Sequence, residues 1–230
     1  MNYAKLIDQT FLKKGASAEE IKKVCKETKE YGFRALCVYP EHTKLAKELL
    51  RDTTVKVTTL IDEPTGASPS ADRIKLVEQA QKNGSDEIEL VMKIDDFKNQ
   101  KYDAVDEDLK SICSILPTKV IIGSGYLTDE EISKASEMTQ GAGAISVKTA
   151  TVDDPLDNTE LEEKAKHVKA MKDSAPDLLI KASGAIRTFD DLKKMMAAGA
   201  DIIGTSSGVE IVNETSGQDI SVNEEWRRKE

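Results

Sequence analysis

Short apolar runs alternate with longer charged segments along most of the chain. Several runs are continuously apolar rather than strictly alternating, as expected for parallel strands that helices cover on the outside. Eight runs are candidate strands, at residues 5–10, 33–40, 55–61, 87–94, 119–124, 144–150, 178–184 and 201–207. The first of them has the weakest pattern.

The segments between these runs carry helix signals. Four helices are expected to begin after caps at Ser17, Ser68, Thr128 and Thr188. Glu20 and Glu131 follow the first and third caps by three residues, which is the spacing of a capping box. Gly32 is placed to end the first helix.

Successive candidate strands begin 22 to 34 residues apart, the length of one βα unit. Eight such units predict a single-domain (β/α)8 TIM barrel over residues 1–212. A doubly wound sheet is the alternative, but it usually has fewer strands and a glycine-rich first turn, and the chain has no GxGxxG motif. Residues 213–230 are almost wholly polar, and we expect them to form a flexible tail.

Composition narrows the function. The 230 residues are 39% hydrophobic and 33% charged, with a net charge of -9 and a pI of about 5.0. This acidic balance argues against nucleic acid and anionic membranes as partners. No signal-peptide core and no membrane-spanning window are recognisable, so we expect a cytoplasmic protein.

Cysteine and histidine give little support to metal chemistry. Cys25, Cys37 and Cys113 show neither a CxxC motif nor metal-ligand spacing, which fits a reducing compartment. His42 and His167 stand among charged residues and are expected on solvated helix surfaces. A zinc site or a Ser-His-Asp triad is therefore poorly supported, and no metal is expected.

Two lysines on neighbouring strands carry the clearest chemical signal. In such barrels the site lies at the C-terminal ends of the strands, where Lys148 and Lys181 occupy similar late positions on strands six and seven. Two ammonium groups in a dry cavity repel and lower each other's pKa, so that one can become the neutral amine that a Schiff-base nucleophile requires. Glu89, within strand four, could shuttle protons. The alternative is a structural salt-bridge network of these lysines with Glu89 and Asp8.

Small residues near the last two strands suggest an anion site. Gly184 lies in the turn after strand seven, while Gly204, Ser206 and Ser207 belong to strand eight and its following turn. Backbone N–H groups and a helix dipole at such turns often bind phosphate in barrels. The alternative is that these residues only connect elements.

An ordered set of motifs resembles the deoxyribose-phosphate aldolase family over nearly the full length. The motifs are "IDQTFLK" (7–13), "ALCVYP" (35–40), "DEIELV" (86–91), "KVII" (119–122), "VKTAT" (147–151), "KASGAIRT" (181–188) and "GTSSG" (204–208). The resemblance implies a (β/α)8 barrel and a class I reaction without metal or organic cofactor. In that reaction 2-deoxyribose 5-phosphate is cleaved reversibly to acetaldehyde and glyceraldehyde 3-phosphate.

The resemblance also implies roles for individual residues. Lys148 is the implied Schiff-base lysine, and Lys181 the neighbour that favours its neutral form. Glu89 matches the acidic proton relay, and Asp8 the aspartate of the first strand. The substrate-binding candidates are Thr10, Cys37, Thr149, Gly184, Gly204, Ser206 and Ser207. Family members are commonly dimers or tetramers that act on small aldehydes and sugar phosphates.

Several positions depart from the family pattern. Glu89 replaces the usual aspartate, Val152 and Ala185 stand where glycines are common, and Asp153 and Asp154 follow Val152. These changes suggest that aldol chemistry is retained while phosphate recognition is altered or weakened. Two further readings stay open: a related Schiff-base aldolase with another, possibly unphosphorylated substrate, and a non-catalytic barrel of the same family.

Overall fold

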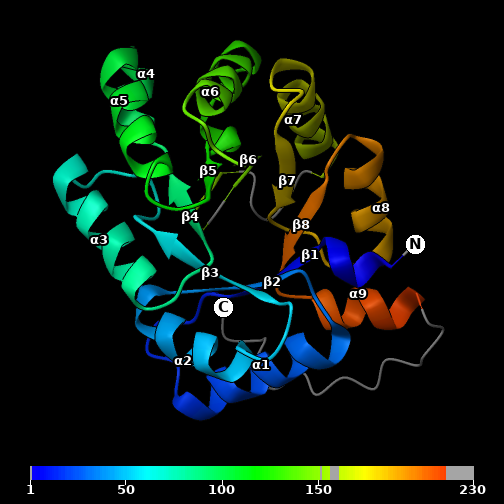
Figure 1. The fold of residues 1–230 in the computed structure, drawn as a ribbon. Helices are drawn as coiled ribbons and strands as arrows, with labels where there is room; N and C mark the ends of the chain where they lie inside the picture. The colour runs from blue at the N-terminus through cyan, green and yellow to red at the C-terminus, as the bar shows by residue number, and fades with distance from the viewer. Residues whose placement is uncertain (1, 151, 156–160, 216–230) are drawn as a thin grey trace.

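Eight parallel strands form a closed barrel in the computed structural model, which describes residues 2–150, 152–155 and 161–215 (Figure 1). Each strand pairs with the next, and β8 pairs with β1. The strands are β1 (Ile7–Phe11), β2 (Ala35–Val38), β3 (Lys56–Ile61), β4 (Glu87–Val91), β5 (Thr118–Ile121), β6 (Ser146–Lys148), β7 (Leu179–Ser183) and β8 (Ile202–Thr205). The barrel prediction is confirmed, and each of the eight apolar runs overlaps one strand.

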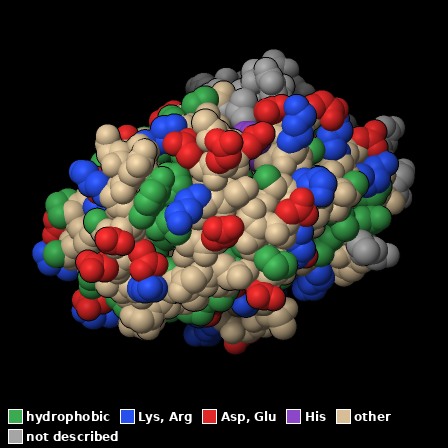
Figure 2. All heavy atoms as spheres, turned by 90° about the horizontal axis from the view of Figure 1, so that it is seen from above, with side chains coloured by type: hydrophobic (Ala, Val, Ile, Leu, Met, Phe, Trp, Pro, Cys, Tyr) green, Lys and Arg blue, Asp and Glu red, His purple; other side chains and the backbone are tan. Residues whose placement is uncertain are grey.

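Helices surround the barrel on its outside (Figure 1). They are α1 (Ala18–Tyr31), α2 (Pro40–Leu50), α3 (Ser70–Lys82), α4 (Ile94–Lys98), α5 (Tyr102–Cys113), α6 (Asp129–Gly141), α7 (Leu161–Ser174), α8 (Phe189–Ala197) and α9 (Gly208–Thr215), with short 3-10 turns η1 (Tyr3–Leu6) and η2 (Ser124–Tyr126). None of the helices in the described residues is both long and apolar enough to cross a membrane. Acidic and basic side chains are interspersed on the face seen in Figure 2.

Local capping fixes where the helices begin. The Ser17 hydroxyl accepts from the Glu20 N–H at 3.3 Å, and the Glu20 carboxylate accepts from the Ser17 N–H at 2.8 Å. The same reciprocal pair forms between Thr128 and Glu131 at α6. Each pair satisfies backbone donors that the first helical turn leaves open, so these two predicted helix starts are confirmed.

The expected cap at Ser68 is wrong. Helix α3 begins at Ser70 with Pro69 as its N-cap residue. The Ser68 hydroxyl instead donates to Asp62 Oδ1 at 2.6 Å. A carboxylate within the preceding loop thus occupies the hydroxyl that would have capped the helix.

The expectation of solvated histidines is also wrong. His42 and His167 are 7% and 5% exposed. His42 lies on the buried face of α2 with Thr43, Ala46 and Leu50. Many charged neighbours in the sequence lie on other faces of these helices, while Lys164 is buried on the same face as His167. This mixture obscured the 3.6-residue period.

The C-terminal boundary falls later than expected. Helix α9 continues to Thr215, three residues beyond the proposed end of the barrel at 212. The Asn213 side chain accepts a hydrogen bond from the Tyr31 hydroxyl at 3.0 Å. The rest of the proposed tail, residues 216–230, lies outside the described residues.

Candidate active site

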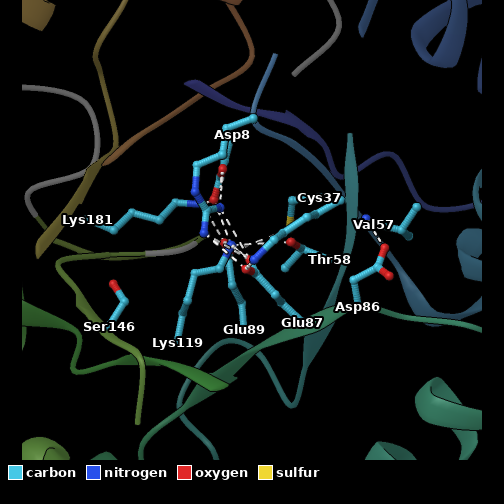
Figure 3. A network of polar contacts seen from close by, with 12 residues as sticks. Asp8, Cys37, Val57, Thr58, Asp86, Glu87, Glu89, Lys119, Ser146 and Lys181 are labelled. Carbon is cyan, nitrogen blue, oxygen red and sulfur yellow. Dashed lines mark hydrogen bonds and ion pairs between the residues drawn. The ribbon is translucent and has the colours of Figure 1, made fainter. Parts of the chain in front are cut away.

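One carboxylate joins the two lysines singled out in the sequence. Lys148, the last residue of β6, is the register partner of Lys181 in β7, and the two residues are 3% and 0% exposed. The Lys148 Nζ donates to Glu89 Oε2 at 2.6 Å, while the Lys181 Nζ donates to Glu89 Oε1. Figure 3 shows Glu89 and Lys181 meeting inside the barrel. Charge-assisted hydrogen bonds of this kind are strong and directional.

Asp8 completes the group from β1. Its Oδ2 accepts from both Lys181 and Lys119, each at 2.7 Å. Burial alone would raise the pKa of Asp8, but Lys119 and Lys181 outweigh burial and hold that pKa well below its usual range. The carboxylate therefore stays ionised.

Lys181 is the lysine that keeps its charge. Burial favours loss of its proton, but the carboxylates of Asp8 and Glu89 outweigh burial and raise the pKa of Lys181 above its ordinary value. The expected repulsion between the two lysines is therefore not what sets the pKa of Lys181. Asp8 and then Glu89 have the larger effects, and the sequence did not show that Glu89 lies between the lysines.

Three charged residues of this network were not among the sequence candidates. Lys119, at 0% exposure, lies 2.9 Å from Glu87 and 3.6 Å from Glu89. Arg34 bonds to both Glu87 and Asp8. A signal for Glu87 was present, because residues two apart on a strand point to the same face and Glu89 was already placed inward. Lys119 could have been found as a further lysine in an apolar run, besides Lys148 and Lys181.

Of the proposed substrate-binding residues, Cys37 contacts Glu89, while Thr149 joins two strands. The Cys37 Sγ lies 3.5 Å from Glu89 Oε2, and burial raises the pKa of the Cys37 thiol to about 12. The thiol is therefore protonated. The Thr149 hydroxyl bonds to both the C=O and the N–H of Ser183, which ties the end of β6 to β7. The Thr10 hydroxyl makes only a 3.4 Å contact with the Asp8 C=O.

Gly204 lies inside β8, within the run expected for the eighth strand, while Ser206 and Ser207 follow the strand. A Cβ added there would be 2.7 Å from the Lys181 Cε and 3.0 Å from the Ser183 Cβ. Gly204 thus leaves room for the Lys181 side chain to cross the barrel.

Internal partners already occupy several amides at the expected phosphate site. At the start of α9 the Ser207 N–H donates to Thr205 Oγ1 at 2.9 Å, and the Gly208 N–H donates to Gln9 Oε1 at 3.2 Å. At the start of α8, the N–H groups of Arg187 and Thr188 both donate to one oxygen of Asp191, each at 2.9 Å. The Gly184 C=O accepts from the buried Lys164 at 2.6 Å, and the Ser206 C=O accepts from Gln9.

Apart from Glu89, which lies within β4, the residues that depart from the family pattern lie in loops after the strands. Asp153 and Ala185 have φ values of 63° and 56°, the left-handed region that favours glycine. Asp154 is 6% exposed, and its Oδ2 accepts from the Gly125 N–H at 3.2 Å. One of the two added carboxylates therefore ties neighbouring loops together.

A possible metal-ligand group occurs elsewhere in the described residues. Asp129, Glu163 and His167 offer ligand atoms within 4.8 Å of one another. They belong to α6 and α7, in the outer ring of helices (Figure 1). Asp129 is exposed and Glu163 is paired with Lys166. This group contributes nothing to the lysine and carboxylate cluster inside the barrel.

Comparison with known proteins agrees with the barrel and its motifs. The model of the DeoC/LacD family aldolase matches residues 3–224. A deoxyribose-phosphate aldolase of Caldanaerobacter subterraneus subsp. tengcongensis is 41% identical over 221 residues, covering 93% of this chain and 94% of that protein. One from Staphylococcus haemolyticus is 42% identical, covering 92% and 96%.

Solved structures give the same result. The structure named "QR15, an Aldolase" superposes with a TM-score of 0.85 at 38% identity, covering 93% of this chain and 96% of that one. A deoxyribose phosphate aldolase from Aeropyrum pernix, described as a tetramer, superposes with a TM-score of 0.83 at 27% identity, covering 93% and 90%. The chain belongs to the DeoC/LacD family of aldolases.

Proposed function

We propose that the protein is a class I aldolase that reversibly cleaves 2-deoxyribose 5-phosphate to acetaldehyde and glyceraldehyde 3-phosphate, with Lys148 as the Schiff-base lysine. The observation that carries this proposal is the buried Glu89 carboxylate, which is bonded at once to Lys148 and to Lys181, whose pKa is raised by Asp8 and Glu89. A nucleophilic amine, a fixed cation and a proton carrier are the groups that imine chemistry requires.

The first half of the reaction forms the covalent intermediate. The neutral Lys148 amine attacks the aldehyde carbon C1 of the open-chain sugar, and the resulting carbinolamine loses water to give an iminium ion. Glu89, 2.6 Å from the Lys148 Nζ, is the group placed to accept and return the protons of these steps. The Lys181 ammonium lies on the opposite oxygen of the same carboxylate.

The second half breaks the carbon–carbon bond. Removal of the C3 hydroxyl proton drives cleavage of the C2–C3 bond, and the electron pair moves into the iminium to form an enamine. Glyceraldehyde 3-phosphate leaves. Protonation of the enamine at C2 and hydrolysis of the new iminium release acetaldehyde and restore the Lys148 amine.

A second candidate is the same chemistry with weakened selection for phosphate. It is favoured by the amides at the starts of α8 and α9 that are already bonded to Asp191, Thr205 and Gln9. The exposed Asp153 carboxylate also opposes an anion electrostatically. An unphosphorylated 2-deoxy sugar would then be accepted with little loss of rate.

We further propose a homo-oligomeric, cytoplasmic enzyme. The Aeropyrum pernix relative is described as a tetramer. The cysteines Cys25, Cys37 and Cys113 are free thiols, which suits a reducing compartment. Light scattering on the purified protein tests the assembly.

Trapping the imine tests the role of Lys148. The protein is incubated with acetaldehyde, reduced with borohydride and analysed by mass spectrometry with peptide mapping. We expect one ethyl group on Lys148, and none in Lys148→Ala. Lys22→Ala, a surface lysine variant on α1, is the matched control and should be modified as the parent is. An adduct that persists in Lys148→Ala would disprove the assignment.

Substrate selection separates the two candidates. The kcat/KM values for cleavage of 2-deoxyribose 5-phosphate and of 2-deoxyribose are compared in the parent and in Val152→Gly. A large preference for the phosphorylated sugar in the parent would exclude weakened phosphate selection. Similar values, with a preference restored by Val152→Gly, would support it.

A further inference from the structure

Arg34 bridges two carboxylates from different strands. It lies immediately before β2, and its guanidinium donates to Asp8 Oδ1 at 2.7 Å and to Glu87 Oε1 at 3.0 Å. The other oxygen of Asp8 is shared by Lys119 and Lys181. Both oxygens of Asp8 are therefore held by cations, and Arg34 reaches the one that the lysines do not use.

The bridge extends the candidate active site toward the start of the strands. Alternating charges lead from Lys148 through Glu89, Lys181 and Asp8 to Arg34 and on to Glu87. Figure 3 shows the three carboxylates and Lys181 of this set converging within the barrel. The titratable groups that face one another here, taken in strand order, are Asp8, Arg34, Cys37, Lys56, Glu87, Glu89, Lys119, Lys148 and Lys181.

Lys148 has fewer carboxylate partners than the other buried lysines of this cluster. Among the described residues it pairs with Glu89, whereas Lys119 and Lys181 each pair with more than one carboxylate. The buried carboxylates are the three of Asp8, Glu87 and Glu89, while the cations are the four of Arg34, Lys119, Lys148 and Lys181. Loss of one proton balances the cluster. Arg34 and Lys181 both have a raised pKa. Lys56 adds positive charge at the rim but is 49% exposed, so water screens it.

We propose that Arg34 is a positioning residue for the aldol reaction: by bridging Asp8 and Glu87 it keeps both carboxylates neutralised, so that protonated Lys148 is the surplus cation of the cluster and yields its neutral amine. Without Arg34, the cluster would hold three cations and three carboxylates. Its charges would then cancel with Lys148 protonated, so the cluster would no longer favour the neutral amine. The proposal rests on the function proposed above for Lys148.

The pH dependence of imine trapping with acetaldehyde and borohydride tests this role. Arg34→Met is expected to move the midpoint of adduct formation to higher pH by about one unit, because the cluster loses a cation that is bonded to Asp8 and Glu87. Glu87→Gln removes a carboxylate and should move the midpoint to lower pH. Arg34→Lys keeps the charge and should restore most of the parent profile. Opposite shifts from the two bridge partners are not expected from general damage to the fold.

Lys56→Met is the matched control, because Lys56 also bonds to Glu87 but does not reach Asp8. A midpoint shift as large as that of Arg34→Met would show that the bridge to Asp8 is not the cause and would overturn the proposal. So would unchanged midpoints, or shifts of the same sign, in folded Arg34→Met and Glu87→Gln. If Arg34→Met does not fold, the direction of the midpoint shift in Glu87→Gln decides: a shift to lower pH supports the proposal, and a shift to higher pH overturns it. Absence of any adduct in the parent would instead reject the proposed function itself.

Discussion

At the scale of single residues, Gly204 makes room for the charged lysine. A methyl group at this position would lie 2.7 Å from the Lys181 Cε. We expect Gly204→Ala to displace Lys181 from Glu89 and to lower kcat at least about tenfold, since a misplacement of 1 Å in a catalytic group can cost that much or more. Steady-state kinetics give the value. Gly141→Ala is the control, because its added Cβ meets nothing within 4 Å; equal kcat values for both variants would contradict the argument.

Ala185 is a second residue at which a substitution has an effect that depends on the backbone conformation. Its φ of 56° is strained for a side chain with a Cβ. We expect Ala185→Gly to raise the free energy of unfolding by about 0.5–1 kcal/mol, measured by urea denaturation. Ala198 has a φ of -78°, so Ala198→Gly should lower the free energy of unfolding instead. Destabilisation by both variants would show that strain at Ala185 is negligible.

The catalytic candidates could be read from sequence because they sit at strand positions. Lys148, Lys181, Glu89 and Asp8 do converge, since inward positions of parallel strands meet in a closed barrel. Arg34 could not be found in this way. It precedes its strand, and only the path of its long side chain brings it to Asp8.

At the scale of elements, Gln9 on β1 forms hydrogen bonds with the backbone at the start of α9. Its side chain is 2% exposed, donates to the Ser206 C=O at 3.0 Å and accepts from the Gly208 N–H. Replacing it by leucine leaves two buried backbone groups without these partners. We expect Gln9→Leu to lower the free energy of unfolding by about 2–4 kcal/mol, measured in urea.

A matched variant separates this effect from a general effect of losing glutamine. The exposed Gln79 on α3 donates to the side chain of Asn83, the residue that caps the end of the helix. We expect Gln79→Leu to change the free energy of unfolding by no more than about 0.5 kcal/mol. A loss for Gln9→Leu as small as that for Gln79→Leu would mean that water or rearranged backbone satisfies the groups near α9.

Elements were easier to predict than their ends. Apolar runs located all eight strands, but the run 144–150 contains a strand of only Ser146–Lys148. Hydrophobicity continues past the ladder because the loop residues Thr149 and Ala150 are also buried. The misplaced cap at Ser68 has a similar origin, since its bond to Asp62 depends on how a loop folds back.

At the scale of the whole molecule, the interior has two different parts. Apolar side chains fill the space between strands and helices, with Ile88, Val120 and Ile180 among those at 0% exposure. Inside the barrel, ions take the place of part of the usual apolar layers, and Leu60, Val91 and Ile121 form a buried apolar cluster beside them. A buried ion pair broken on one side is strongly destabilising, so this interior couples the fold to pH.

The dependence of the free energy of unfolding on pH at acidic pH, here called the acid limb, is the consequence that can be measured. Burial would raise the pKa values of Asp8, Glu87 and Glu89, but the surrounding lysines and Arg34 outweigh it and lower all three. A carboxylate with a lowered pKa in the folded state binds protons more readily when unfolded. Its stabilisation is therefore complete above the unfolded value of about 4 and is lost as pH falls toward the folded value.

We accordingly expect the free energy of unfolding, measured in urea, to decline steeply from about pH 5 downward. Glu20→Gln is the control for surface carboxylates. Hydrogen bonds from Lys13 and Ser17 lower the pKa of Glu20 to about 2, but its side chain is 36% exposed and lies outside the barrel. This variant should keep nearly the whole acid limb, because water screens the pairing that it loses. If Glu20→Gln removed most of the decline, or if stability stayed constant to pH 3, the buried ions would not govern the response to acid.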